Sequence, residues 1–171
     1  MLCLKENENY EKKKEFRYRE RNREERIKYY KTLRNLIKIH GSKSLVFIDE
    51  SGFEAFHACV YAGSRKGNKD LIAPMVFIGS LNAESFEGWL ALYLLPSFTI
   101  PSILIMDNAP IHRKTAIRLL VEEAGHQILF LPKYSPDLND IEHNFSALKR
   151  AIMYSNSATS LDEIIRAYCA T

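Results

Sequence analysis

Two aspartates each follow directly on a run of apolar residues. In "LVFIDES" four apolar residues lead into Asp49, and in "ILIMDNAPIHR" four more lead into Asp107. Runs of this kind predict buried strands, and in open α/β sheets functional sites gather outside the carboxyl ends of the strands. An aspartate also ends many strands as a simple turn former, so either residue alone has an ordinary explanation. Together they predict two acids at one end of a sheet.

A third acid lies in "LPKYSPDLNDIEHNFSALKR", residues 131 to 150, where proline, aspartate and asparagine indicate a turn that leads into a helix from about residue 138. At 100° per residue, one face of this helix carries an apolar stripe of Ile141, Phe145, Leu148 and Ile152. Glu142 lies at the edge of the stripe, toward the sheet, with Lys149 two turns further on. A glutamate at such an edge is usually solvated or ion-paired, so its role depends on the two aspartates.

Three carboxylates that converge at one end of a sheet repel each other unless cations neutralise them. Oxygen ligands without cysteine or clustered histidine favour Mg²⁺ or Mn²⁺. Two such ions, roughly 3.5 to 4 Å apart, can activate a nucleophile and stabilise the leaving oxygen of a phosphoryl transfer. The residue types therefore indicate metal-dependent phosphoryl transfer.

The blocks "FIDESGF", "IMDNAPIH" and "LPKYSPDLNDIEHNFSALKR" resemble the three signature blocks of DDE transposases of the Tc-one/mariner superfamily, most closely the bacterial insertion sequence 630 family. The 34 residues between Asp107 and Glu142 match the spacing typical of that superfamily. The resemblance covers roughly residues 40 to 171. It implies a ribonuclease H-like fold, with Asp49, Asp107 and Glu142 as the catalytic acids and the ligands of two Mg²⁺ or Mn²⁺ ions. It also implies double-stranded DNA as the partner, both transposon ends and target, and a homo-oligomer on that DNA.

The same resemblance implies lesser roles for neighbouring residues. Asn108 and His112, in the block after the second acid, could position DNA phosphates or metal-bound water, although His112 could equally be a helix residue without a role. Tyr134, Ser135 and Pro136 belong to the loop before the third acid, which aims the helix at the metals. The weaker candidates for DNA binding are Asn108, His112, Asn139 and Lys149.

The chain departs from the family pattern in two ways. Asp140 stands where many relatives have proline, a change that we expect to do little damage because an acid is favourable near a helix N-terminus. Relatives also carry a helix-turn-helix region before a basic linker, whereas this chain starts at or within such a linker. We therefore expect the chain to be one of two things. It is either the product of the second of two overlapping reading frames, with a separate N-terminal helix-turn-helix polypeptide as a partner, or a decayed remnant of a transposase.

Residues 1 to 40 hold 13 Lys or Arg against 7 Glu, which leaves the rest of the chain mildly acidic. From residue 12 to 38 there is no proline, and the apolar residues recur at steps of three and four, which predicts an amphipathic helix that stops at Gly41. We expect a basic linker helix over 1–40 and a catalytic domain over 41–171. The basic segment fits phosphate binding, but it could also be a solvated helix held by pairs of opposite charge.

The elements that must position the acids follow the order βββαβαβαα. The predicted elements are strands at about 45–49, 54–61 and 71–79, a helix after an Asn82 N-cap, a strand at "SILIMD", a helix at 112–124 closed by Gly125, a strand at "HQILFLP", and helices from about 138 and 161, the last with a Ser160 and Glu163 capping box. This order indicates an α/β domain with a mixed five-stranded sheet flanked by helices, whose first three strands form an antiparallel meander.

The bulk composition agrees with a globular domain. The chain has 171 residues with 46% hydrophobic content, and its three cysteines show no metal-binding or disulfide spacing. Its longest apolar stretch, "LALYLLPSF", is too short to cross a membrane. We therefore expect a cytoplasmic protein with no membrane partner.

Two other functions stay open on the sequence. A stand-alone ribonuclease H-like nuclease would cut without strand transfer. A catalytically silent fragment that binds DNA or dimerises with a full-length transposase would not cut at all.

Overall fold

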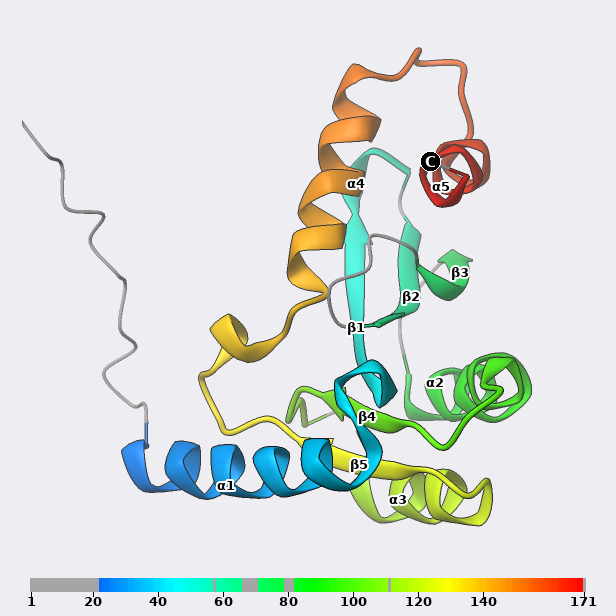
Figure 1. Cartoon of the computed structure of the whole chain (residues 1–171). Coiled ribbons are helices and arrows are strands. Elements are labelled where there is room, and N and C mark those ends of the chain that lie inside the picture. The colour runs from blue at the N-terminus through cyan, green and yellow to red at the C-terminus, as the bar shows by residue number, and fades with distance from the viewer. Residues whose placement is uncertain (1–21, 57, 66–70, 79–81, 111, 171) are drawn as a thin grey trace, which may run out of the picture.

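The computed structural model describes residues 22–56, 58–65, 71–78, 82–110 and 112–170. Its strands and helices follow the predicted order (Figure 1). In sequence order they are α1 (Arg23–His40), β1 (Leu45–Phe53), β2 (Ala58–Arg65), β3 (Ile72–Ile78), α2 (Ala83–Trp89), β4 (Ile103–Met106), α3 (Lys114–Glu123), β5 (Gln127–Phe130), α4 (Glu142–Tyr154) and α5 (Leu161–Cys169).

The strands form one mixed five-stranded sheet in the order β3-β2-β1-β4-β5. Strands β1, β2 and β3 pair antiparallel as a meander, whereas β4 and β5 are added parallel to β1. Each parallel connection contains a helical segment, as parallel crossovers generally do. The predicted meander and the mixed sheet are both confirmed.

The sheet separates two apolar cores, because successive side chains of a strand point to opposite faces. On β1, Leu45 and Phe47 belong to one core while Val46 and Ile48 belong to the other. The first core is covered by α1, α4 and α5, and the second by α2 and α3. All four residues from 45 to 48 are buried because β1 is covered on both faces.

Helix α1 begins after Asn22, whose side chain accepts hydrogen bonds from the backbone N–H groups of the first turn, and it ends at Gly41. Gly41 has a φ of 83°, a left-handed conformation that glycine adopts without strain. The inner side of the helix is fixed by Tyr29, which is 5% exposed within the first core. The part of the predicted helix before residue 22 lies outside the described residues, and the division of the chain near residue 41 stays a prediction.

Helix α2 begins with a capping box in which Asn82 accepts from the backbone N–H of Ser85 at 2.8 Å. It continues beyond Trp89 through one wide helical turn and a short 3-10 turn that contains Pro96. Trp89 is 1% exposed, and its indole N–H donates to the backbone oxygen of Ala73 at 2.8 Å. Its ring packs against Tyr61 and Phe86, so a small aromatic cluster joins α2 to the sheet.

Three predicted boundaries are wrong. Strand β1 does not stop at residue 49 but runs to Phe53, because it stays paired with β2 after β4 has ended. The second strand accordingly starts at residue 58 and not 54. The helix expected from about 138 starts only at Glu142, because a 3-10 turn over Pro136–Leu138 and three further residues come first.

Among the described residues, no helix has the length and the apolar character needed to cross a membrane.

Candidate active site

The two predicted aspartates lie side by side at the ends of the parallel pairing between β1 and β4. The last registered pair is Ile48 with Met106, so Asp49 and Asp107 are the next residues on neighbouring strands. Neighbouring strands are about 4.8 Å apart. Asp49 follows the alternation of Leu45 and Phe47, which places its side chain on the face that α4 covers. Because Ile105 belongs to the same core, the alternation of β4 directs Asp107 to that face as well.

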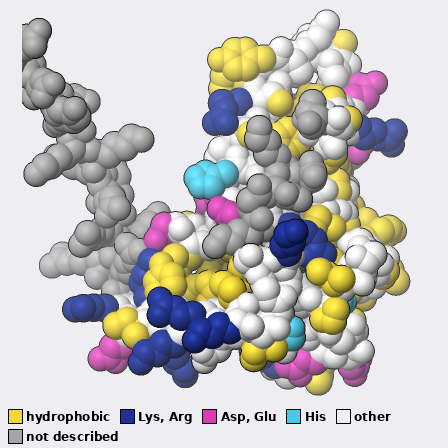
Figure 2. All heavy atoms as spheres, viewed as in Figure 1, with side chains coloured by type: hydrophobic (Ala, Val, Ile, Leu, Met, Phe, Trp, Pro, Cys, Tyr) yellow, Lys and Arg dark blue, Asp and Glu magenta, His cyan; other side chains and the backbone are white. Residues whose placement is uncertain are grey.

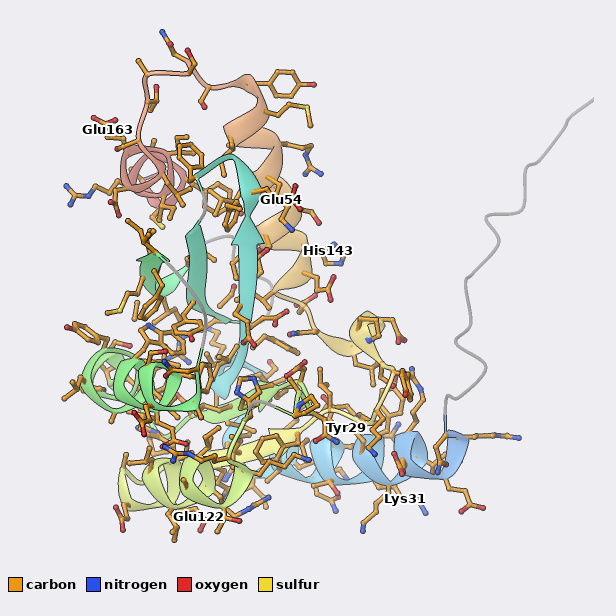
Figure 3. The ribbon with its side chains drawn as sticks, turned by 180° about the vertical axis from the view of Figure 1, so that it is seen from behind. Tyr29, Lys31, Glu54, Glu122, His143 and Glu163 are labelled. Atoms are coloured by element: carbon orange, nitrogen blue, oxygen red, sulfur yellow. The ribbon has the colours of Figure 1, made fainter. Side chains whose placement is uncertain are left out.

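Glu142 reaches this face from α4, as the first residue of that helix. Asp49, Asp107 and Glu142 line one open cleft of about 570 Å³, together with backbone and side chains of residues 108–110 and 131–136. Asn108 and Asn139 line the same cleft. Figure 3 shows the start of α4, marked by His143, next to the segment that joins it to β5. The structure therefore brings the three predicted acids together around one cleft.

The pKa of the Asp49 carboxyl is raised to about 7. Burial is the main cause, opposed by a hydrogen bond from the backbone N–H of Glu50 at 2.9 Å, and repulsion from the carboxylates of Glu50, Asp107 and Glu142 adds to it. The side-chain N–H of Asn139 also donates to Asp49 Oδ2 at 3.0 Å. The surroundings of Asp49 therefore disfavour its negative charge.

Asp107 lies in a different environment. Burial raises the pKa of its carboxyl, but His112 and the backbone N–H of Ala109, which donates to Oδ1 at 3.1 Å, lower it below the ordinary value. The two neighbouring aspartates thus differ in charge, since Asp107 stays ionised at a pH at which Asp49 holds a proton about half of the time.

His112 is buried behind the cleft. Its Nε2 lies 3.5 Å from Asp107 Oδ1 and 3.4 Å from Glu50 Oε1, and its ring packs on Phe86 with centroids 4.5 Å apart. Burial lowers the pKa of the ring, but these two carboxylates raise it more, to about 9. His112 is therefore placed to hold Asp107, and the burial of its ring argues against a direct contact with DNA.

The other weak candidates for DNA binding do not all lie at the acid cleft. Asn108 and Asn139 each have a buried side-chain oxygen with no hydrogen-bond partner among the described residues. Lys149 does not line the cleft, because its ammonium group lies over the ring of Phe53 at 5.8 Å from the centroid. The structure thus brings the two asparagines to the acids and leaves Lys149 apart from them.

Two residues with contacts at the site had no predicted role. Glu50 follows Asp49 directly and contacts His112, a role that strand alternation could have suggested because it turns Glu50 to the opposite face from Asp49. Arg26 of α1 binds Ser135 and Asp137 in the loop before Glu142. Its partners lie more than a hundred residues further along the chain, and no local pattern indicates such a pairing.

A mixed five-stranded sheet with this order, flanked by helices, defines the ribonuclease H-like fold of integrase and transposase catalytic cores. The catalytic domain of Mos1 mariner transposase superposes with a TM-score of 0.62 at 18% identity, covering 86% of this chain and 88% of that one. A structure of the same domain and raltegravir with Mn gives 0.67 at 19% identity, covering 90% of both chains. The catalytic core domain of BIV integrase gives 0.58 at 16% identity, covering 75% of this chain and 82% of the other.

The chain belongs to the DDE superfamily endonucleases, whose family model matches residues 59–165. The match includes Asp107 and Glu142 but starts after Asp49. No curated protein sequence matches the chain.

Proposed function

We propose that this chain is the catalytic part of a transposase, which nicks DNA at transposon ends and joins the freed 3′-hydroxyl to target DNA. In this proposal Asp49, Asp107 and Glu142 are the catalytic acids. The observation that carries it is the arrangement of the three acids: two follow the last registered pair of adjacent parallel strands, and all three line one cleft. The likeness to mariner transposase and integrase cores supports the same class of reaction.

The three acids line one cleft and offer oxygen ligands of the kind that divalent cations prefer. Within the described ranges, no three acidic, histidine or cysteine side chains are arranged around one ion position. The raised pKa of Asp49 reflects burial and repulsion from the nearby carboxylates, and a cation would relieve that repulsion. The free side-chain oxygens of Asn108 and Asn139 add oxygen donors to the same cleft. Carboxylate and amide oxygens select Mg²⁺ or Mn²⁺, the metals with which the Mos1 structures were determined.

We propose that Asp49, Asp107 and Glu142 hold two such ions. The ions would supply charge for the attacking and the leaving oxygen of the phosphoryl transfer. The protein's own contribution is to orient the ligands: Asn139 holds Asp49, while His112 and the backbone N–H of Ala109 hold Asp107 in its ionised form. Glu142 is placed by the first turn of α4.

The DNA partner is proposed from charge and from the family. Exposed basic side chains gather over α1, at the lower left of Figure 2. They are Arg23, Lys28, Lys31, Arg34 and Lys38. In Figure 3, Lys31 lies on the outer side of the helix, away from Tyr29. Exposed Lys and Arg side chains bind DNA phosphates. They give an affinity that falls as the salt concentration rises, and they do not read the base sequence.

A nicking assay tests the proposal. The full chain is incubated with supercoiled DNA and Mg²⁺, with and without EDTA, and with an oligonucleotide duplex that carries a 3′-hydroxyl end. We expect Mg²⁺-dependent nicks and joined products. Nicks without joining would favour a stand-alone nuclease, and DNA binding without either product would favour the silent fragment.

We further propose that the chain belongs with the insertion sequence 630 family, acts as a homo-oligomer on DNA, and depends on a separate helix-turn-helix polypeptide for recognition of transposon ends. Competition binding with a terminal inverted repeat and scrambled DNA at two salt concentrations tests this dependence. We expect weak binding with little preference. A preference of a hundredfold or more, about 2.7 kcal/mol, would show that the chain reads sequence without that polypeptide.

A further inference from the structure

The loop between β5 and α4 carries Asn139 of the candidate site and leads into Glu142, the first residue of α4. Residues 131–141 contain only one short 3-10 turn, Pro136–Leu138. Within this loop Tyr134 has a φ of 54°, a left-handed conformation that costs a residue other than glycine about 1 kcal/mol or more. Such a conformation persists only where surrounding contacts hold it.

Arg26 of α1 supplies such contacts. One guanidinium nitrogen donates to Ser135 Oγ at 2.8 Å and to Asp137 Oδ1 at 3.1 Å, and the other donates to Asp137 Oδ2 at 2.9 Å. The Arg26 side chain is only 12% exposed, and Ser135 is buried. Two-point pairing of a guanidinium with a carboxylate fixes orientation as well as distance. Arg26 thus holds the residues that directly follow Tyr134.

The same loop is connected to the acids. Asn139 follows the 3-10 turn, and its side chain donates to Asp49 at 3.0 Å. Its backbone oxygen accepts from the N–H of Glu142 at 3.3 Å. A shift of the 135–137 segment would therefore move both the partner of Asp49 and the start of α4. Helix α1 can resist such a shift because Tyr29, one turn after Arg26, is anchored in the core.

We propose that Arg26 is a positioning residue for the acid cleft: through Ser135 and Asp137 it fixes the loop that sets Asn139 and Glu142 against Asp49. This inference rests on the proposed function for its activity readout. It assigns the basic helix a second role besides contact with phosphates, because the docked α1 fixes the loop side of the acid cleft.

The test uses Arg26→Gln in the full chain, with Arg166→Gln as the matched control. Both changes remove one positive charge, but Arg166 is an exposed residue on α5. Neither residue belongs to the exposed basic side chains of α1, so we expect the two variants to bind DNA alike. At saturating DNA, only Arg26→Gln should slow single-turnover nicking, by about 10-fold to 100-fold, the size expected for a small misplacement of catalytic groups.

A second readout does not require activity. Mn²⁺ binding without DNA, measured by calorimetry, should be about tenfold weaker in Arg26→Gln and unchanged in Arg166→Gln, a size typical for loss of a group that orients metal ligands. Asp137→Asn breaks the same ion pair from the loop side and keeps the side chain's shape, so it should reproduce both effects even if Arg26→Gln proves unstable.

The outcomes separate the two proposals. If the unchanged protein does not nick DNA under any metal condition, the proposed function fails, while the Mn²⁺ affinities still test the role of Arg26. If the protein nicks DNA but Arg26→Gln and Asp137→Asn match it in rate and Mn²⁺ affinity, the role of Arg26 is wrong. An equal loss of rate in Arg166→Gln would also overturn it, since the cause would then be charge alone.

Discussion

The two sides of the acid cleft are built in different ways. On the sheet side, Asp49 and Asp107 follow residues that are almost fully buried and paired in register. On the loop side, Glu142 is exposed and follows Ile141, which is buried in the first core, and a segment that Arg26 contacts at Ser135 and Asp137. The position of the sheet acids thus follows from strand pairing, whereas that of Glu142 depends also on polar contacts between side chains.

The largest effect should come from the sheet side. We expect Asp107→Ala to reduce nicking by about 1,000-fold or more, because it removes a proposed metal ligand, and such charge stabilisation is worth several kcal/mol. DNA binding should stay the same or become stronger, since a negative charge near the phosphates is lost. Asp162→Ala, an exposed acid on α5, is the control. Full Mg²⁺-dependent cleavage by a clean Asp107→Ala preparation would refute the mechanism.

The pKa of Asp49 offers a second contrast, measured without metal. Because this pKa is raised to about 7, the folded protein holds a proton that the unfolded chain has already released above pH 4. The free energy of unfolding should therefore fall as pH rises from about 4 to about 7, by at most about 4 kcal/mol. Asp49→Asn should flatten this fall, as measured by urea titrations in EDTA.

A matched Asp162→Asn variant should keep the full pH dependence. His112 contributes to the free energy of unfolding over a different pH range. Its raised pKa gives a contribution that is complete below the ordinary value of 6.5 and is lost as the pH rises toward 9. If Asp49→Asn showed the same slope between pH 4 and 7 as the unchanged protein, the buried, proton-holding state of Asp49 would be wrong.

The third contrast separates stability from activity. Ile105→Ala, in the fully buried part of β4, should lower the free energy of unfolding by about 2 to 5 kcal/mol. Leu138→Ala, in the loop, should lower it by only about 1 kcal/mol, because Leu138 is partly buried. Nicking per folded molecule should show the reverse order. A larger loss of rate in Ile105→Ala, measured where both variants are folded, would contradict the division of the cleft into these two sides.

The same division explains what the sequence predicts well. The sheet acids and the meander were predictable because apolar runs, strand alternation and turn residues are local signals. The N-cap at Asn82 and the capping box at Ser160 were predictable for the same reason. The loop side was predicted less well: the start of α4 was placed four residues too early, because a 3-10 turn has the same local composition as a first helical turn.

The contacts that hold the loop could not be predicted from local patterns. Arg26 is one of many basic residues in α1, and nothing in its neighbourhood distinguishes it until α1 is packed against Ser135 and Asp137. Similarly, the pairing of His112 with both Glu50 and Asp107 requires the bend after β4 to bring the ring back behind the strand ends. Long-range pairings of this kind follow from the packed fold.

The aromatic cluster that joins α2 to the sheet places an intrinsic fluorophore close to the acids. Trp89 is the single tryptophan of the chain, and its buried indole packs against Phe86, whose ring also packs against that of His112. His112 in turn contacts Asp107. Emission from one fluorophore therefore comes from a place only two side chains away from the acids. We expect occupation of the cleft to change the emission of Trp89, which can be measured in real time without a label on the protein or on the DNA.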